Sequence, residues 1–168
     1  MSCSLRPVER AHRARLEQLT RATGRFREEE VATAVELLEE SLGGDDEYRF
    51  VGAFDLPAET LVGYACWGPT PGTEGTCDLY WIVVDPERQG AGVGTLLLEE
   101  VEGRLRVDGS RLVMVETSSR ADYAPTRAFY ERRGYTRAAT IPGYYAPGDD
   151  LVIYTKDLTD GELARASS

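Results

Sequence analysis

One stretch constrains this chain more than any other, residues 80–101, which read YWIVVDPERQGAGVGTLLLEEV. It begins with five apolar residues, as expected of a buried β-strand. Asp85-Pro86 then ends the strand, because proline has no N–H to donate to a neighbouring strand. Three glycines follow, and an amphipathic helix pattern begins beside the last of them. Its apolar residues recur every four positions, at Val93, Leu97, Val101 and Leu105, and the opposite side carries Glu99, Glu100, Glu102 and Arg104. Since the first N–H groups of a helix have no partner within it, this strand, turn and helix start predict a site for a phosphate-bearing ligand.

Two common phosphate-binding motifs do not match the turn. The dinucleotide motif G-x-G-x-x-G fails because its last position is Thr95 when counted from Gly90, and Leu97 when counted from Gly92. The nucleotide motif G-x-x-x-x-G-K-[ST] needs a lysine, which the turn lacks. A nucleotide- or dinucleotide-binding protein is therefore disfavoured. A glycine-rich connection without a ligand stays open as the plain structural alternative, although each glycine costs about 1 kcal/mol wherever the turn is helical.

Length and charge narrow the class of protein. The chain has 168 residues, 42% of them hydrophobic, so we expect a single domain over residues 1–168 with a core of its own and a frayed tail at 158–168. The net charge of −10 argues against nucleic acid or a membrane surface as a partner, and it is compatible with a cationic substrate. We expect no membrane-spanning segment and no signal peptide, because no apolar run has the required length or position.

The metal-binding and redox-active residues are few and scattered along the chain. They are Cys3, Cys66, Cys77 and the single histidine, His12. This set fits neither a zinc site nor a disulfide framework, so we expect no metal and a reducing, cytoplasmic location.

The rest of the chain predicts alternating helices and strands. Apolar and alternating patterns indicate strands over residues 3–8, 48–54, 61–67, 77–84, 111–117, 135–141 and 151–156. Helical patterns cover residues 9–22 and 27–42, the segment from Val93, and a short segment that starts at Pro125. The strands 77–84 and 111–117 flank a helix and should be parallel neighbours. Residues 142–150 (PGYYAPGDD) are expected to form a loop.

Two motifs resemble those of a known family. Gln89, Gly92 and Gly94 form Q-x-x-G-x-G after the V-x-P of residues 84–86, and residues 128–135 read AFYERRGY. The first is similar to the acyl-CoA pyrophosphate loop of the GNAT N-acetyltransferase superfamily, and the second to the end of that family's last helix. The resemblance covers essentially the whole chain. It implies an α/β (α+β) fold: a mixed, mostly antiparallel sheet with a parallel, splayed strand pair and flanking helices.

The resemblance also implies a co-substrate and residues that bind it. Acetyl-CoA, or another acyl-CoA, would donate its acyl group directly to a primary amine, with no metal. Backbone groups of the strand end would pair with the pantetheine arm, and backbone N–H groups of the turn would hold the pyrophosphate: Ile82, Val83, Val84, Gln89, Gly90, Ala91, Gly92, Val93, Gly94 and Thr95. Where the family often has an asparagine that contacts pantetheine this chain has Tyr123, and where it has alanine the chain has Thr126.

Catalysis of this reaction needs a general acid and a general base. Tyr130 occupies the position of the family's acid, and a phenol with a pKa near 10 keeps its proton at neutral pH. The alternative for Tyr130 is core packing beside Phe129. For the base, Asp78 is preferred, because it matches a strand position where the histone-acetylating branch of the family has its glutamate base. Glu116, which ends the next parallel strand, is the alternative. A water chain without either carboxylate also stays open, whereas Asp85 and Glu87 are interpreted as turn residues.

The acceptor is the least determined part of the prediction. In the GNAT fold the connection at 142–150 borders the acceptor site, and here it carries Tyr144, Tyr145, Asp149 and Asp150. Rings and carboxylates suit a cationic amine, small or peptidyl. The alternative is that these residues only shape the hairpin. A homodimer is compatible with the sequence. A second function class also stays open, a non-catalytic module of the same fold that binds acyl-CoA as a regulatory ligand.

Overall fold

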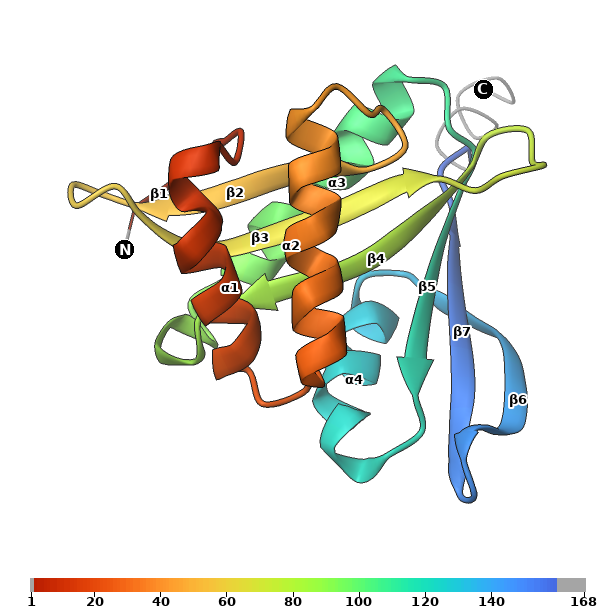
Figure 1. The fold of residues 1–168 in the computed structure, drawn as a ribbon. Coiled ribbons are helices and arrows are strands. Elements are labelled where there is room, and N and C mark those ends of the chain that lie inside the picture. Colours follow the sequence, from red (N-terminus) through yellow and green to blue (C-terminus); the bar gives the residue numbers. More distant parts are fainter. Residues whose placement is uncertain (1, 160–168) are drawn as a thin grey trace. The chain divides into compact units, whose positions relative to one another are not determined.

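The computed structural model describes residues 2–159 (Figure 1), and residues 160–168 of the predicted tail lie outside this range. The helices are α1 (Arg13–Ala22), α2 (Glu28–Leu42), α3 (Val93–Val107) and α4 (Ala124–Arg132). The strands are β1 (Cys3–Arg6), β2 (Arg49–Asp55), β3 (Thr60–Pro69), β4 (Thr76–Val84), β5 (Leu112–Ser118), β6 (Thr136–Ala146) and β7 (Asp149–Asp157). The predicted order of elements is confirmed.

The strands form one mixed sheet, hydrogen-bonded in the order β1-β2-β3-β4-β5-β7-β6. Strands β1, β2 and β3 pair antiparallel in sequence, and β7 pairs antiparallel with both β5 and β6. The pair β4–β5 is parallel, with residues 76–78 opposite residues 112–114. Helix α3 connects these two strands, as expected of a parallel crossover. The predicted mixed sheet with one parallel pair is therefore confirmed.

The chain divides into two compact units. The first contains the residues up to 69 and residues 80–104, and the second contains residues 70–79 and the residues from 105 onward. Strand β4 and helix α3 each contribute residues to both units.

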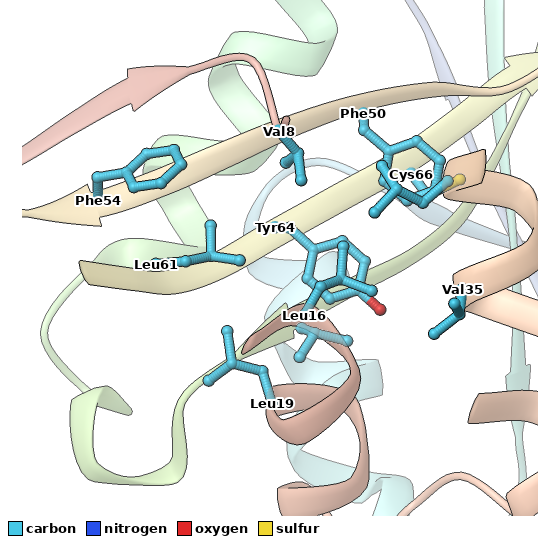
Figure 2. Close-up of a cluster of buried hydrophobic side chains, with 11 residues drawn as sticks. Val8, Leu16, Leu19, Val35, Phe50, Phe54, Leu61, Tyr64 and Cys66 are labelled. Carbon is cyan, nitrogen blue, oxygen red and sulfur yellow. The ribbon is translucent and has the colours of Figure 1, made fainter. Parts of the chain in front are cut away.

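The core of the first unit lies between β2–β4 and the helices α1 and α2. Figure 1 shows both helices on one face of these strands and α3 on the opposite face. The side chains that meet under α1 and α2 (Figure 2) are Val8, Leu16, Leu19, Val35, Leu38, Phe50, Phe54, Leu61, Tyr64, Cys66 and Val83. The Tyr64 hydroxyl lies 2.6 Å from Thr20 Oγ1 and accepts a hydrogen bond from Trp81 Nε1 at 3.1 Å. This buried polar atom is therefore satisfied.

In the second unit, buried and more exposed residues alternate along most of strand β5. Along β5, Val113, Val115 and Thr117 are buried while Glu116 is exposed, so one face of the strand packs into the core and the other is open to solvent at Glu116. Tyr130 of α4 and Tyr135, which follows it, are buried in this unit with ring centroids 5.3 Å apart. The second unit thus has an apolar core on one face of β5 and an open face on the other.

Three local predictions were wrong. The predicted loop 142–150 is mostly strand, because the β6–β7 ladder runs through a bulge to the pair Ala146–Asp149 and leaves only a turn at Pro147-Gly148. Glu102, predicted on the polar side of α3, is buried, because the apolar face is wide enough to include Leu98 and the residue one turn later. The first helix begins at Arg13, after a short 3-10 turn at residues 10–12.

Candidate functional site

The turn predicted to bind phosphate lies at the end of β4 in the first unit. We call residues 85–95 the glycine loop. Its first part is a 3-10 turn over residues 86–88, capped by Asp85, whose Oδ1 accepts a hydrogen bond from the Glu87 N–H at 3.0 Å. Proline at the first position of this turn has the backbone angle that a helical start requires. Asp85 and Glu87 are turn residues, as predicted.

Two glycines determine the backbone conformation of the loop. Gly90 and Gly92 have φ values of +80° and +84°, a conformation that side chains rarely adopt. A Cβ at either position would meet no heavy atom within 4 Å. The conformation therefore requires glycine, while the space beside the backbone is open to a ligand.

Helix α3 presents its N-terminus to this loop. The buried stripe of Val93, Leu97, Val101 and Leu105 confirms the predicted helix face. The Leu96 N–H donates to the Gly92 carbonyl at 3.0 Å, so Gly92 is the N-cap residue. The N–H groups of Val93 and Gly94 therefore precede the first hydrogen bond of the helix and have no acceptor within it. These groups suit a pyrophosphate, which is anionic and accepts several hydrogen bonds.

The other residues predicted to bind acyl-CoA divide between the units. Ile82 and Val84 are half-buried and Val83 is buried, all at the end of β4, and residues 89–92 are exposed. Tyr123 belongs to the second unit, where it precedes α4 and lies beneath the Arg120 guanidinium, 5.1 Å from its ring centroid.

Two ion pairs hold the glycine loop, and sequence reasoning missed them. Arg15 on α1 donates from Nη2 to Asp85 Oδ2 at 2.7 Å. Arg88 donates from Nη2 to Asp55 Oδ2, at the end of β2, at 2.6 Å. An aspartate before a proline signals a cap. The sequence around Asp85 does not indicate that Arg15, 70 positions away, is its partner, since only the fold brings the two residues together.

The two carboxylates predicted as alternative bases lie in the second unit on one face of the sheet. Asp78 is opposite Met114 in the β4–β5 ladder, and Glu116 follows Met114 on the same face. Glu116 is exposed, yet partial loss of water around its carboxyl raises its pKa, and the negative charge of Asp78 raises it further. The structure thus brings both candidates together.

One of the predicted acceptor-binding residues, Tyr145, lies near this carboxylate pair, and a second, Tyr144, contacts Tyr145. Tyr145 is about half exposed, and its ring meets Tyr144 edge to face at a centroid distance of 4.9 Å. Loss of water around Tyr145 and, second, the negative charge of Glu116 raise the pKa of its hydroxyl to about 12. Asp78, Glu116 and Tyr145 therefore form one electrostatically connected group, which we call the acidic face.

The remaining two predicted residues have partners within the chain. Asp149 pairs with the Ser118 hydroxyl, and the Asp150 Oδ1 accepts from the Gly143 N–H at 2.8 Å. The Asp150 backbone N–H also donates to Ser119 Oγ at 2.8 Å. These contacts tie the β6–β7 hairpin to the end of β5. They favour the hairpin-shaping alternative for both aspartates.

Tyr130 lies in the buried part of the second unit. It is 4% exposed, its ring packs edge to face on Phe129 and Tyr135, and burial raises its pKa. Within residues 2–159 its hydroxyl has no hydrogen-bond partner. These contacts favour the core-packing alternative for the ring, while the hydroxyl donates its proton to no group within the described residues.

The helix that carries Tyr130 is fixed at both ends. Arg127 donates from Nη1 to the carbonyls of Ser118 at 2.6 Å and Arg120 at 2.9 Å. At the other end, Lys156 Nζ donates to the Arg133 carbonyl at 2.9 Å, which satisfies one of the last carbonyls of α4.

Over the described residues 2–159, no group of three or more histidine, cysteine, aspartate and glutamate side chains is arranged to hold a metal ion. In the same part of the chain, no helix combines the length and apolarity needed to cross a membrane.

Comparisons with known proteins agree with this geometry. A crystal structure of a GNAT-family protein from Desulfovibrio desulfuricans is 42% identical, with a TM-score of 0.87 over 94% of this chain and 99% of that chain. The PaiA N-acetyltransferase from Thermoplasma acidophilum, solved in complex with coenzyme A, is 18% identical, with a TM-score of 0.70 over 91% of this chain and 98% of that chain. The second likeness shows the fold alone.

A relative named for its activity matches over part of its length. The S-(2-succino)cysteine N-acetyltransferase of Bacillus subtilis is 32% identical over 72 residues, which span 43% of this chain and 44% of that protein. The chain thus matches less than half the length of this relative. Residues 13–135 match the profile of the acetyltransferase (GNAT) family. This match takes in α1 to α4 and the glycine loop, and with it the chain belongs to the GNAT acetyltransferase family.

Proposed function

We propose that this protein is an acyl-CoA-dependent N-acetyltransferase that moves an acetyl group from acetyl-CoA directly to a primary amine. The observation that carries the proposal is the glycine loop, where an open backbone and the N–H groups of Val93 and Gly94 meet at the start of a helix. Structural neighbours solved with coenzyme A support the choice of ligand.

The chain offers a backbone surface for each part of acyl-CoA. Residues 89–95 would hold the pyrophosphate through N–H groups, and Ile82, Val83 and Val84 would pair with the pantetheine arm like an added strand. Tyr123 is proposed as a further contact. Acetyl-CoA, when bound, supplies a thioester carbonyl to the attacking amine, and its thiolate leaves.

Tyr130 is the proposed general acid. A phenol keeps its proton at neutral pH, and burial raises the pKa of this one further, while no group within residues 2–159 accepts its proton. Such a hydroxyl can protonate a leaving thiolate.

The acidic face is the proposed source of the general base. An amine must lose a proton before attack, and a carboxylate with a raised pKa accepts a proton more readily than an ordinary one. Glu116 has this property, so we favour it over Asp78 as the base and assign Asp78 the role of raising that pKa. The same negative charges, with the Tyr144–Tyr145 rings, favour a cationic acceptor.

The acceptor class is a small or peptidyl amine. The name of the Bacillus relative points to amino-acid-like amines, and it makes S-(2-succino)cysteine a member of the first substrate panel. We propose a cytoplasmic enzyme, with neither nucleic acid nor membrane as a partner, that is able to form a homodimer.

Two measurements test the proposal. Calorimetry should detect acetyl-CoA binding and no comparable binding of NAD or ATP. Release of free CoA thiol should then be followed with amino acids, polyamines, aminoglycosides and peptide amines. Absence of acetyl-CoA binding overturns the proposal. Binding without thiol release for any amine favours the regulatory module.

A further inference from the structure

Arg15 connects three parts of the first unit. Its Nε donates to the Leu61 carbonyl at the start of β3 at 3.0 Å, and its Nη1 donates to Gln18 Oε1 on its own helix at 2.9 Å. Its Nη2 reaches Asp85, the first residue of the glycine loop. One guanidinium therefore joins α1, β3 and the loop.

Asp85 is held from several directions. Its N–H donates to the Val62 carbonyl at 2.8 Å, and its carbonyl accepts from the Arg88 N–H at 2.8 Å. Its carboxylate accepts hydrogen bonds from the Glu87 backbone N–H and from the Arg15 guanidinium. Asp85 therefore fixes the start of the loop to β3.

This ion pair is shielded from water, unlike most of those on the same helix. The Arg15 and Asp85 side chains are 29% and 14% exposed. Arg21, also on α1, pairs with Glu17 and Glu28, and those three side chains are 49%, 37% and 72% exposed. Shielded pairs are screened less by solvent, so the Arg15–Asp85 pair constrains its surroundings more than the Arg21 pairs do.

We propose that Arg15 is a positioning residue for the glycine loop, which it holds in its ligand-binding shape through Asp85. Arg88, paired with Asp55, holds the same loop from β2. The inference rests on the proposed function, because the ligand of the loop is taken to be acyl-CoA. It goes beyond that function by assigning a role to a residue of α1 that does not belong to the loop.

The first experiment measures acetyl-CoA affinity by calorimetry for Arg15→Met, Asp85→Asn and, as a matched control on the same helix, Arg21→Met. We expect the dissociation constant to rise about tenfold for Arg15→Met and Asp85→Asn, and to stay within about twofold for Arg21→Met. Arg15→Lys keeps the charge but loses the fork of donors, and should give an intermediate value. In steady state, the KM for acetyl-CoA should rise while kcat stays within about twofold.

The Asp85→Asn variant separates positioning from general electrostatics. Removing a negative charge would tighten the binding of an anionic ligand if charge alone mattered. Positioning predicts weaker binding instead, while asparagine still caps the turn. The double variant should lose less than the sum of the two single losses, since both disrupt one pair. Tighter binding by Asp85→Asn, or equal losses for Arg15→Met and Arg21→Met, overturns the inference.

The second experiment does not depend on the ligand. Amide hydrogen exchange of the protein without acetyl-CoA should become faster in residues 85–95 for Arg15→Met, and remain unchanged there for Arg21→Met. Unchanged exchange in the loop of Arg15→Met overturns the inference. If the wild-type protein does not bind acetyl-CoA, the proposed function fails, and the exchange result still decides whether Arg15 positions the loop.

Discussion

Glu116 on β5 has a raised pKa because its carboxyl loses water and because Asp78, on the neighbouring strand β4, places a second negative charge near it. The relationship follows from the register, since Asp78 lies opposite Met114 and Glu116 lies on the same face as Met114. Two carboxylates on one face affect each other's protonation, so a change in one should be measurable at the other.

The first prediction concerns this coupling. Asp78→Asn removes the neighbouring negative charge, so the pKa of Glu116 should fall, as followed by the NMR shift of its carboxyl carbon. Asp122→Asn, at an exposed site paired with Arg120, is the control and should leave Glu116 unchanged. If Glu116 is the base, the rising limb of the pH profile of kcat/KM should shift to lower pH in Asp78→Asn and disappear in Glu116→Gln. Loss of that limb in Asp78→Asn would instead identify Asp78 as the base.

The second prediction concerns stability and pH. The folded protein holds the Glu116 proton more tightly than the unfolded chain, so the contribution of Glu116 to stability should fall as the pH rises from about 4 through the raised pKa. Glutamine does not ionise. The melting temperature of Glu116→Gln should therefore match the wild type near pH 4 and exceed it at pH 7, by about 1–3 °C because the side chain is exposed. An equal difference at both pH values would contradict the assigned direction.

The third prediction concerns Tyr130. Tyr130→Phe keeps the packed ring and removes a hydroxyl that has no partner within residues 2–159, so the melting temperature should hold or rise slightly. If the hydroxyl is the acid, kcat should fall roughly 10²- to 10⁴-fold with little change in acetyl-CoA affinity. Single-turnover kinetics measures the chemical step directly. An unchanged rate in that measurement leaves Tyr130 with packing alone.

The fourth prediction concerns the glycine loop. Gly92→Asp and Gly94→Asp place a carboxylate at the phosphate site, so both variants should lose acetyl-CoA binding in calorimetry. Gly109→Asp is the control for Gly92, since both glycines have a positive φ and open space for a Cβ, and Gly103→Asp is the control for Gly94 within α3. Near-normal affinity in the folded loop variants would falsify the loop assignment.

The fifth prediction concerns the β6–β7 hairpin. Asp150→Ala removes the acceptor of the Gly143 N–H, which should cost about 1–2 kcal/mol of unfolding free energy, measured by urea denaturation. The acceptor KM should hold, since this carboxylate already has a partner. Tyr145→Phe, which keeps the ring, should leave stability nearly unchanged. A higher acceptor KM with normal stability in Asp150→Ala would restore the acceptor-binding role of the aspartate.

The sequence predicted the elements that depend on local patterns. Local patterns predicted a strand from the apolar run before Asp85, a turn from the glycines after it, and a helix from the four-residue spacing between Val93 and Leu105. The structure contains each of these elements. The prolines and glycines around Tyr144 and Tyr145 predict a loop. The ladder of β6 and β7 absorbs those residues in a bulge, which depends on pairing with a distant strand.

The contacts that the sequence did not reveal are between distant residues. Three side-chain contacts join residues at least 31 positions apart: Arg15–Asp85, Arg88–Asp55 and Ser118–Asp149. The sequence around each residue does not indicate which distant residue it contacts. For the candidate site, local motifs supplied the candidate residues, while the structure alone grouped Glu116 with Asp78 and Tyr145. The prediction of a single domain stays a prediction.

The hydrogen bond from Lys156 to the end of α4 has a practical consequence, because Lys156 is the only lysine in the sequence. Its ammonium group is occupied by the Arg133 carbonyl and faces the Tyr135 ring at 5.4 Å, so it is a poor nucleophile. Self-acylation of lysine can therefore add at most one modified form to the intact mass spectrum. Thiol release in the absence of an added amine should remain low. Acceptors that react slowly should therefore give a rate of thiol release that is measurable above that background.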